Sequence, residues 1–193
     1  MSFAALYAHC QSLAVPIKRP ELILKICELT KRQDPIRVMV SDDMDITVIY
    51  GFIIWPGDTN HAYAKFCGME PIIVIARGLH AYDQRFVVVK ELMHLFDDAL
   101  ERVSTAEEFE TLLSEFSVPA PTPPSAAMQS ESKAVWMALA AMCPESLRQA
   151  LQRKREKGEM TDADIADHLK IPQQFVPHLF VPNFKEIVAY LIR

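Results

Sequence analysis

The feature that most limits how this chain can fold is a block of short β-type runs set between segments with helical periodicity. Within residues 35–76, β-branched and aromatic residues gather in runs that are separated by Asp, Gly, Pro and Asn. These runs are residues 36–40, 46–54, 63–66 and 72–75. Strands this short, with turn residues between them, predict a small antiparallel sheet.

The segments on both sides of this block have apolar residues at helical spacing. Residues 3–13 and 20–32 come before it, and Pro20 suits the first turn of a helix. Residues 81–103 and 105–116 come after it, and further helical runs follow towards the C-terminus. We therefore predict an α+β fold in which helices cover the sheet.

The chain is expected to form one domain over residues 1–193, because half of its residues are apolar and can build a core without disulfides or a structural metal. Its expected parts are N-terminal helices at 1–34, the sheet at 35–76, two helices at 81–116, a Pro-rich loop at 117–130 and a helical part at 131–193. The loop holds its prolines among small and polar residues, a composition typical of an extended linker.

The charge balance argues against a nucleic-acid ligand. The chain has 25 Asp and Glu against 20 Lys and Arg, so it lacks the basic footprint of a DNA-binding protein. Its four cysteines are scattered without a Cys-x-x-Cys pair, which favours buried thiols in a reducing compartment. Because we find no signal-peptide pattern and no apolar run of about 18 residues, we expect a cytoplasmic protein with no membrane partner.

The strongest chemical signal lies in residues 85–96, which read RFVVVKELMHLF. Its core, KELMH at residues 90–94, is a His-Glu-x-x-His zinc motif in which Lys90 replaces the first histidine. In the intact motif two imidazoles on one helical face hold zinc, and the glutamate polarises the attacking water. A protonated lysine has no lone pair for zinc. Alone, the remaining Glu-x-x-His spacing is more typical of a solvated surface pair than of a catalytic site.

Segments that flank the motif extend the pattern. An apolar run at residues 70–76 precedes it, ESKA follows at 131–134, and an apolar helical run ends in MCP at 142–144. Together with the motif, these segments resemble the ImmA/IrrE family of zinc metallopeptidases. That family's pattern is a strand, then Arg-Phe-x-x-x-His-Glu-x-x-His, then Glu-x-x-Ala-Asn ahead of a helix that closes in a Met-Pro pair. The resemblance spans residues 70 to 180 and implies a zincin-like metallopeptidase core.

The resemblance also implies roles for individual residues. His94 matches the second zinc ligand, Glu131 matches the third ligand, and Glu91 matches the general base. Lys90 falls on the position of the first ligand. Because the family's site uses three protein ligands and keeps water in the fourth position, the two remaining ligands are expected to hold zinc too weakly.

A metal-free alternative is visible in the same helix. Lys90, His94 and Asp98 follow one another at i, i+4 spacing, with Glu91 and Asp97 beside them. If Glu131 converges there, as the resemblance implies, the Lys90 ammonium would take over the electrostatic role of the metal by pairing with the carboxylates. We therefore hypothesise a salt-bridged pseudo-active site that needs no cofactor.

Two other interpretations stay open. In the first, His94, Asp98 and Glu131, with or without His80 or His61, form a shifted zinc site, and Glu91 activates water for amide hydrolysis in an active endopeptidase. In the second, the chain is an unrelated α+β interaction module and the likeness is accidental.

The resemblance further implies a protein partner. Members of the family act on helix-turn-helix repressors, often encoded beside them in mobile elements and in toxin–antitoxin or stress-response modules. Residues 161–178 of this chain themselves resemble a short helix-turn-helix, but Pro177 interrupts the second helix, so we expect a packing module without direct nucleic-acid binding. The Pro-rich loop lies between His94 and Glu131, where it would either gate access of the partner or form a surface insertion.

Overall fold

The computed structural model describes residues 2–33, 36–57, 62–98, 101–102, 108, 111–112 and 123–193. These residues form a small sheet and a larger set of helices, which confirms the predicted α+β class. In chain order, the elements are α1 (Phe3–Cys10), α2 (Arg19–Leu29), β1 (Arg37–Ser41), β2 (Gly51–Ile54), the 3-10 helix η1 (Ala64–Phe66), β3 (Ile72–Ala76), α3 (Ala81–Met93), the 3-10 helix η2 (His94–Phe96), α5 (Ala126–Met142), α6 (Glu145–Glu156), α7 (Asp162–Leu169), the 3-10 helix η3 (Gln173–Phe180) and α8 (Phe184–Leu191).

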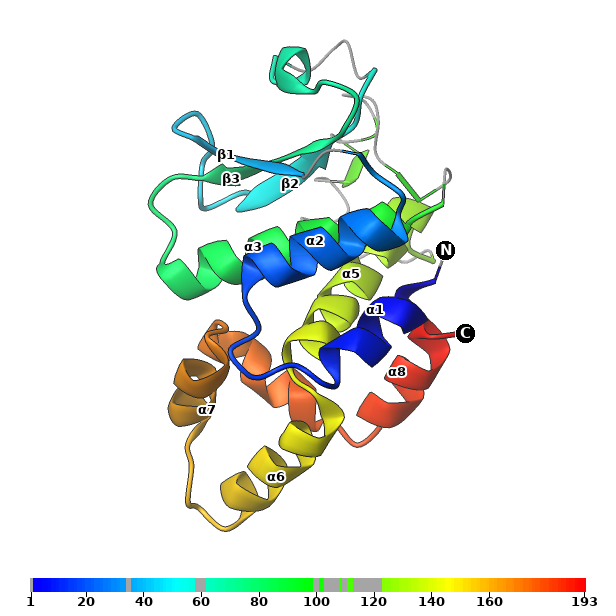
Figure 1. The fold of residues 1–193 in the computed structure, drawn as a ribbon. Coiled ribbons are helices and arrows are strands. Elements are labelled where there is room, and N and C mark those ends of the chain that lie inside the picture. The colour runs from blue at the N-terminus through cyan, green and yellow to red at the C-terminus, as the bar shows by residue number, and fades with distance from the viewer. Residues whose placement is uncertain are drawn as a thin grey trace.

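The elements are arranged in layers. Figure 1 shows the sheet at one end of the molecule, α2 and α3 lying across one of its faces, and α5, α1 and the C-terminal helices on the far side of α3. The main core fills the space between these layers, and a smaller apolar cluster lies on the opposite face of the sheet. α3 is therefore the central helix of the fold.

The sheet is mixed, so the prediction of an antiparallel sheet is wrong. The strand order is β1-β3-β2, with β1 parallel to β3 and β2 antiparallel to it. β3 is the central strand, and all five of its residues are buried. A continuously apolar strand is typical of a sheet centre, but its pattern does not say in which direction its neighbours run. The predicted strand at 63–66 is also wrong, since this run contains η1.

α3 is apolar around most of its surface because it packs against the sheet on one side and α5 on the other. Residues 86–89, Leu92 and Met93 are all buried. On the sheet side, β2 approaches so closely that a Cβ atom added to Gly51 would lie 2.6 Å from Cγ1 of Val87. A helix enclosed in this way exposes little surface, so the charged residues in its last turn must find partners inside the protein.

Two predicted boundaries differ from the structure. The helix predicted over 81–103 ends at Met93, and η2 follows it. The loop predicted over 117–130 is also too long, because Ser125 caps α5 by accepting a hydrogen bond from the Met128 amide, and residues 126–130 are helical. The helix predicted at 105–116 and the first part of the loop lie largely outside the described residues.

The C-terminal helices pack into the main core. α7 ends at Lys170, which adopts the left-handed conformation with a φ of 54°, and η3 follows with Pro177 inside it. Apolar residues of both elements, including Ile165 and Leu179, join the main core. The four cysteines are buried and unbridged, as predicted. Among the described residues, no helix combines the length and the hydropathy that crossing a bilayer requires.

Candidate functional site

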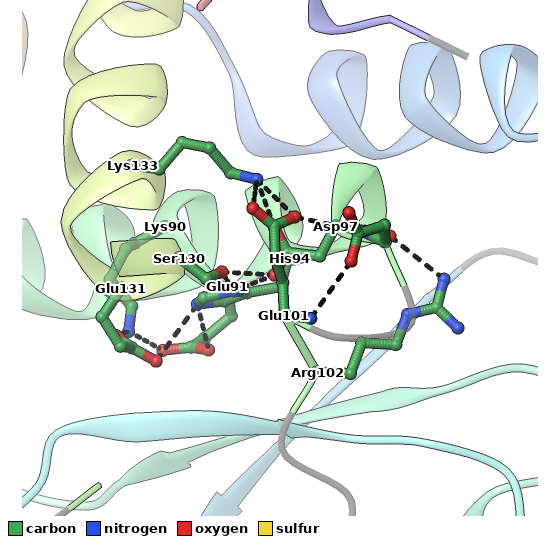
Figure 2. Close-up of polar contacts among 10 residues, drawn as sticks. Lys90, Glu91, His94, Asp97, Glu101, Arg102, Ser130, Glu131 and Lys133 are labelled. Atoms are coloured by element: carbon green, nitrogen blue, oxygen red, sulfur yellow. Dashed lines mark hydrogen bonds and ion pairs between the residues drawn. The ribbon is translucent and has the colours of Figure 1, made fainter. Parts of the chain in front are cut away.

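The residues of the zinc-type motif lie where α3 ends against the first turns of α5. Lys90 and Glu91 come from the last turn of α3, and His94 follows directly after it. Ser130 and Glu131 come from α5, which packs along α3. Figure 2 shows these side chains pointing toward one another between the two helices. The four residues that the sequence predicted to meet therefore do lie in one cluster.

The Lys90 ammonium lies between two carboxylates. Its Nζ atom is 2.6 Å from Oε2 of Glu131 and 2.8 Å from Oε1 of Glu91. The side chain of Glu91 is 2% exposed and that of Lys90 is 16% exposed, so both ion pairs are shielded from water. A fixed cation thus neutralises two carboxylates that would otherwise repel each other in a poorly solvated place.

His94 connects Glu131 to a further acidic residue, Asp97. Its Nδ1 atom is 2.7 Å from Oδ2 of Asp97, and its Nε2 atom is 3.3 Å from Oε1 of Glu131. The contact with Glu131 is an ion pair that falls short of regular hydrogen-bond geometry. The Ser130 hydroxyl donates to the same Asp97 oxygen at 2.6 Å. Both ring nitrogens of His94 therefore face an anionic oxygen.

These contacts set the charge states of the cluster. Burial alone would lower the pKa of Lys90, but Glu91 and Glu131 outweigh burial and raise it above its ordinary value. Burial would also lower the pKa of His94, yet its contacts with Asp97 and Glu131 raise it to about 9. For Glu131 the effect of burial is overcome by Lys90 and His94, which hold the pKa of its carboxyl well below the usual range. Burial raises the pKa of Glu91. At neutral pH, Lys90 and His94 are thus cations.

Lys133 anchors the acidic end of the cluster. Its Nζ atom lies 3.1 Å from Oδ1 of Asp97 and 2.6 Å from Oε1 of Glu101. Asp97 is only 1% exposed and contacts His94, Ser130 and Lys133 together (Figure 2). The sequence placed Asp97 beside the row formed by Lys90, His94 and Asp98. It gave no signal for Lys133, which has no position in the motif.

Asp98, which the sequence placed in the pseudo-site, lies at the surface instead. Its backbone amide donates to Oε2 of Glu101 at 3.0 Å, and its Oδ1 accepts from the Glu101 amide at 3.2 Å. This reciprocal pair is a capping box, and an Asp-x-x-Glu spacing was the signal that a new turn begins at Asp98. Because α3 ends at Met93, the i, i+4 projection from His94 does not reach residue 98. Asp97 is the carboxylate that meets His94.

The residues present do not fit a zinc ion. Zinc needs neutral imidazole nitrogens and free carboxylate lone pairs, whereas both ring nitrogens of His94 face carboxylate oxygens and the space between Glu91 and Glu131 holds the Lys90 ammonium. Across the described part of the chain, no group of three or more His, Cys, Asp and Glu side chains is arranged to hold a metal ion. His80 caps the opposite end of α3, and His61 lies outside the described residues.

The raised pKa of His94 predicts a loss of stability at alkaline pH. The stabilisation from its protonated form is complete below the ordinary pKa of 6.5 and is lost as pH rises through about 9. Between these limits the free energy of unfolding is expected to fall by about 3 kcal/mol at most. Urea unfolding at pH 6, 7.5 and 9.5 measures this fall. In His94→Gln the slope should be absent over this range, and an unchanged slope would assign the pH dependence to another group.

Comparisons with protein families, with curated proteins and with solved structures find no match.

Proposed function

We propose that this protein is a non-catalytic regulator of the ImmA/IrrE type, in which a lysine ammonium replaces the metal and the former peptidase site serves as a structural core. The observation that carries this proposal is the position of the Lys90 Nζ atom, 2.6 Å from Glu131 and 2.8 Å from Glu91. These are the carboxylates that the resemblance assigns to metal binding and to water activation.

The state of Glu91 supports a lack of peptidase activity. A general base must be ionised and must reach a water molecule beside the substrate. Here the Glu91 side chain is 2% exposed and one of its oxygens is paired with Lys90, so a water molecule beside a substrate has little access to it. Both ring nitrogens of His94, the other motif residue, face carboxylate oxygens of Asp97 and Glu131, so neither nitrogen is free for a metal in this arrangement.

Lys90 is also a poor candidate for a new chemistry of its own. A lysine acts as a nucleophile only when its amine is neutral, which requires a pKa lowered towards neutrality. The carboxylates of Glu91 and Glu131 have the opposite effect and stabilise the ammonium form. Function is therefore expected to reside in protein binding, and the partner implied by the resemblance is a helix-turn-helix repressor or a related antitoxin-like protein.

Zinc content and cleavage test the proposal together. Purified wild-type protein is expected to contain less than about 0.1 zinc per chain by mass spectrometry of the metal, since one histidine and one carboxylate hold zinc too weakly. Incubated with the repressor encoded beside its gene, it should form a complex in size-exclusion chromatography and leave the repressor intact by mass spectrometry.

The matched variants are Lys90→His, Glu91→Gln and, as a control for exposed lysines, Lys157→His. Lys90→His restores the full zinc motif and is expected to gain about one zinc per chain, whereas Lys157→His should gain none. Repressor cleavage by the wild type that disappears in Glu91→Gln would establish the alternative, an active zinc-dependent endopeptidase with an altered metal site. Stoichiometric zinc in the wild type would equally contradict the proposal.

A further inference from the structure

The two edges of the sheet differ in charge. β1 and β2 are the edge strands, because β3 lies between them. β2 carries no charged residue, whereas β1 begins at Arg37 and is followed directly by Asp42 and Asp43, all three of them exposed. Arg77 pairs with Asp42, but Arg37 and Asp43 have no ion-pair partner among the described residues. The edge at β1 is thus positive at one end and negative at the other.

The backbone of β1 offers hydrogen bonds on its outer side. Ser41 lies opposite Ala76 in the parallel pairing with β3, and its carbonyl oxygen accepts from the Arg77 amide at 2.8 Å. Because the backbone groups of successive strand residues point to opposite sides, those of Val38 and Val40 point away from β3. In the described part of the chain, no strand pairs with this outer side. An edge of this kind is a template for a further strand.

Exposed apolar side chains also gather around the sheet. Eight large apolar side chains are exposed among the described residues, and six of them come from residues 40–69. These six are Val40, Ile46, Val48, Tyr50, Phe66 and Met69. Val40 belongs to β1 itself and is 46% exposed, and Phe66 lies near the start of β1, because its carbonyl oxygen accepts from the Arg37 guanidinium. Apolar exposure concentrated in this way is typical of a surface that another protein covers.

We propose that β1 pairs with β1 of a second copy of this chain, antiparallel to it, so that one sheet runs through a two-fold symmetric dimer. The outward backbone groups set the register. Val38 of one copy and Val40 of the other exchange hydrogen bonds, and the two-fold axis passes beside Met39. The proposal does not involve Lys90, so zinc content and repressor cleavage are independent of its outcome.

Charge complementarity favours a second copy in this orientation. Arg37 then lies diagonally opposite Asp43 of the other copy on the same face of the sheet, within reach of its long side chain. The two-fold axis repeats this contact, so both cations and both carboxylates are paired. On the other face, Val40 packs beside Val38 of the second copy and loses its exposure to water. Parallel pairing of the two strands would instead bring like charges together.

The size of this contact sets the expected affinity. Because β1 has five residues, the interface is smaller than the roughly 1,200 Å² of a standard one, and we expect a dissociation constant of about 10–100 μM. Sedimentation velocity between about 1 and about 300 μM should show a shift from monomer to dimer. A chain that stays monomeric at the highest concentration overturns the proposal.

Hydrogen exchange at single-residue resolution tests the location of the contact in the wild type. Between about 1 and about 300 μM, exchange of the Val38 and Val40 amides should slow about threefold or more, because these N–H groups gain an acceptor in the dimer. The amides of Met39 and Ser41 already face β3, so they act as the internal control. A dimer in which the Val38 and Val40 amides keep their monomer rates contradicts pairing through β1.

Charge reversal tests the orientation. Arg37→Glu and Asp43→Lys should each weaken self-association at least about tenfold, since each creates two like-charge contacts in the dimer. An equimolar mixture of the two variants should form a heterodimer within about threefold of the wild-type affinity, because both contacts again join opposite charges. Arg153→Glu, which reverses an exposed cation on α6, should dimerise like the wild type. Full dimerisation of either single variant, or a mixture that stays monomeric, overturns the antiparallel arrangement.

Discussion

Replacing Lys90 by methionine is expected to lower the free energy of unfolding by about 3–5 kcal/mol. The change keeps an unbranched chain but removes the ammonium, so Glu91 and Glu131 are left facing each other without a cation between them. Breaking a buried ion pair from one side is costly because the remaining charges have no water to solvate them. Urea unfolding at pH 7, followed by circular dichroism, measures the loss.

Two further variants show whether this loss comes from uncompensated charge. Lys90→Met/Glu91→Gln/Glu131→Gln removes the carboxylates as well and should recover at least half of the lost stability. Lys25→Met removes a lysine that pairs with Glu28 at 2.8 Å on the surface and should cost less than about 1 kcal/mol. If Lys90→Met costs no more than Lys25→Met, the ammonium does not compensate the buried carboxylates and the interpretation of the site fails.

Asp97→Asn is expected to destabilise the protein by about 3 kcal/mol. The substitution preserves shape but removes the charge that faces His94 and Lys133, and it places an NH₂ group or a neutral oxygen where three donors converge. The pKa of His94 should then fall, because its largest favourable contact is the one with Asp97. NMR titration of the His94 ring and urea unfolding measure the two effects.

Asp98→Asn is the matched control, because it changes the neighbouring residue in the same way at the surface. Asparagine can still accept from the Glu101 amide, so the cost should stay below about 0.5 kcal/mol and the pKa of His94 should not move. A larger effect from Asp98→Asn than from Asp97→Asn would restore Asp98 to the cluster and contradict the geometry reported above.

Much of the fold could be predicted because helical periodicity is carried by single segments. α1 and α2 lie where their apolar spacing indicated, α5 contains the predicted apolar run that ends at Met142, and the α+β class follows from the order of these segments. The sheet could not be predicted to the same depth. Strand direction depends on which strands pair. β1 pairs with β3 and not with β2, the next strand in sequence, and tertiary packing decides this pairing.

The candidate site was predictable where the residues lie on regular helix. Lys90, Glu91 and Glu131 project from α3 and α5 as helical spacing requires, whereas the meeting of Glu131 with His94 was implied only by the resemblance. Helical spacing failed beyond the end of α3, where it indicated Asp98 although the carboxylate that contacts His94 belongs to Asp97. Beyond a helix end, side-chain direction is set by local hydrogen bonds, and the reciprocal pair of Asp98 and Glu101 turns the Asp98 carboxylate away from the cluster.

The ion pair between Lys90 and Glu131 joins residues 41 positions apart and lies between two helices of the main core. Such a contact forms only when α3 and α5 dock, so the cluster belongs to the same cooperative unit as the interior of the protein. Amide protons at the end of α3 should consequently exchange with solvent only through global unfolding. If the protein is the regulator that we propose, it would contact its partner through its outer surface while the charged interior stays closed.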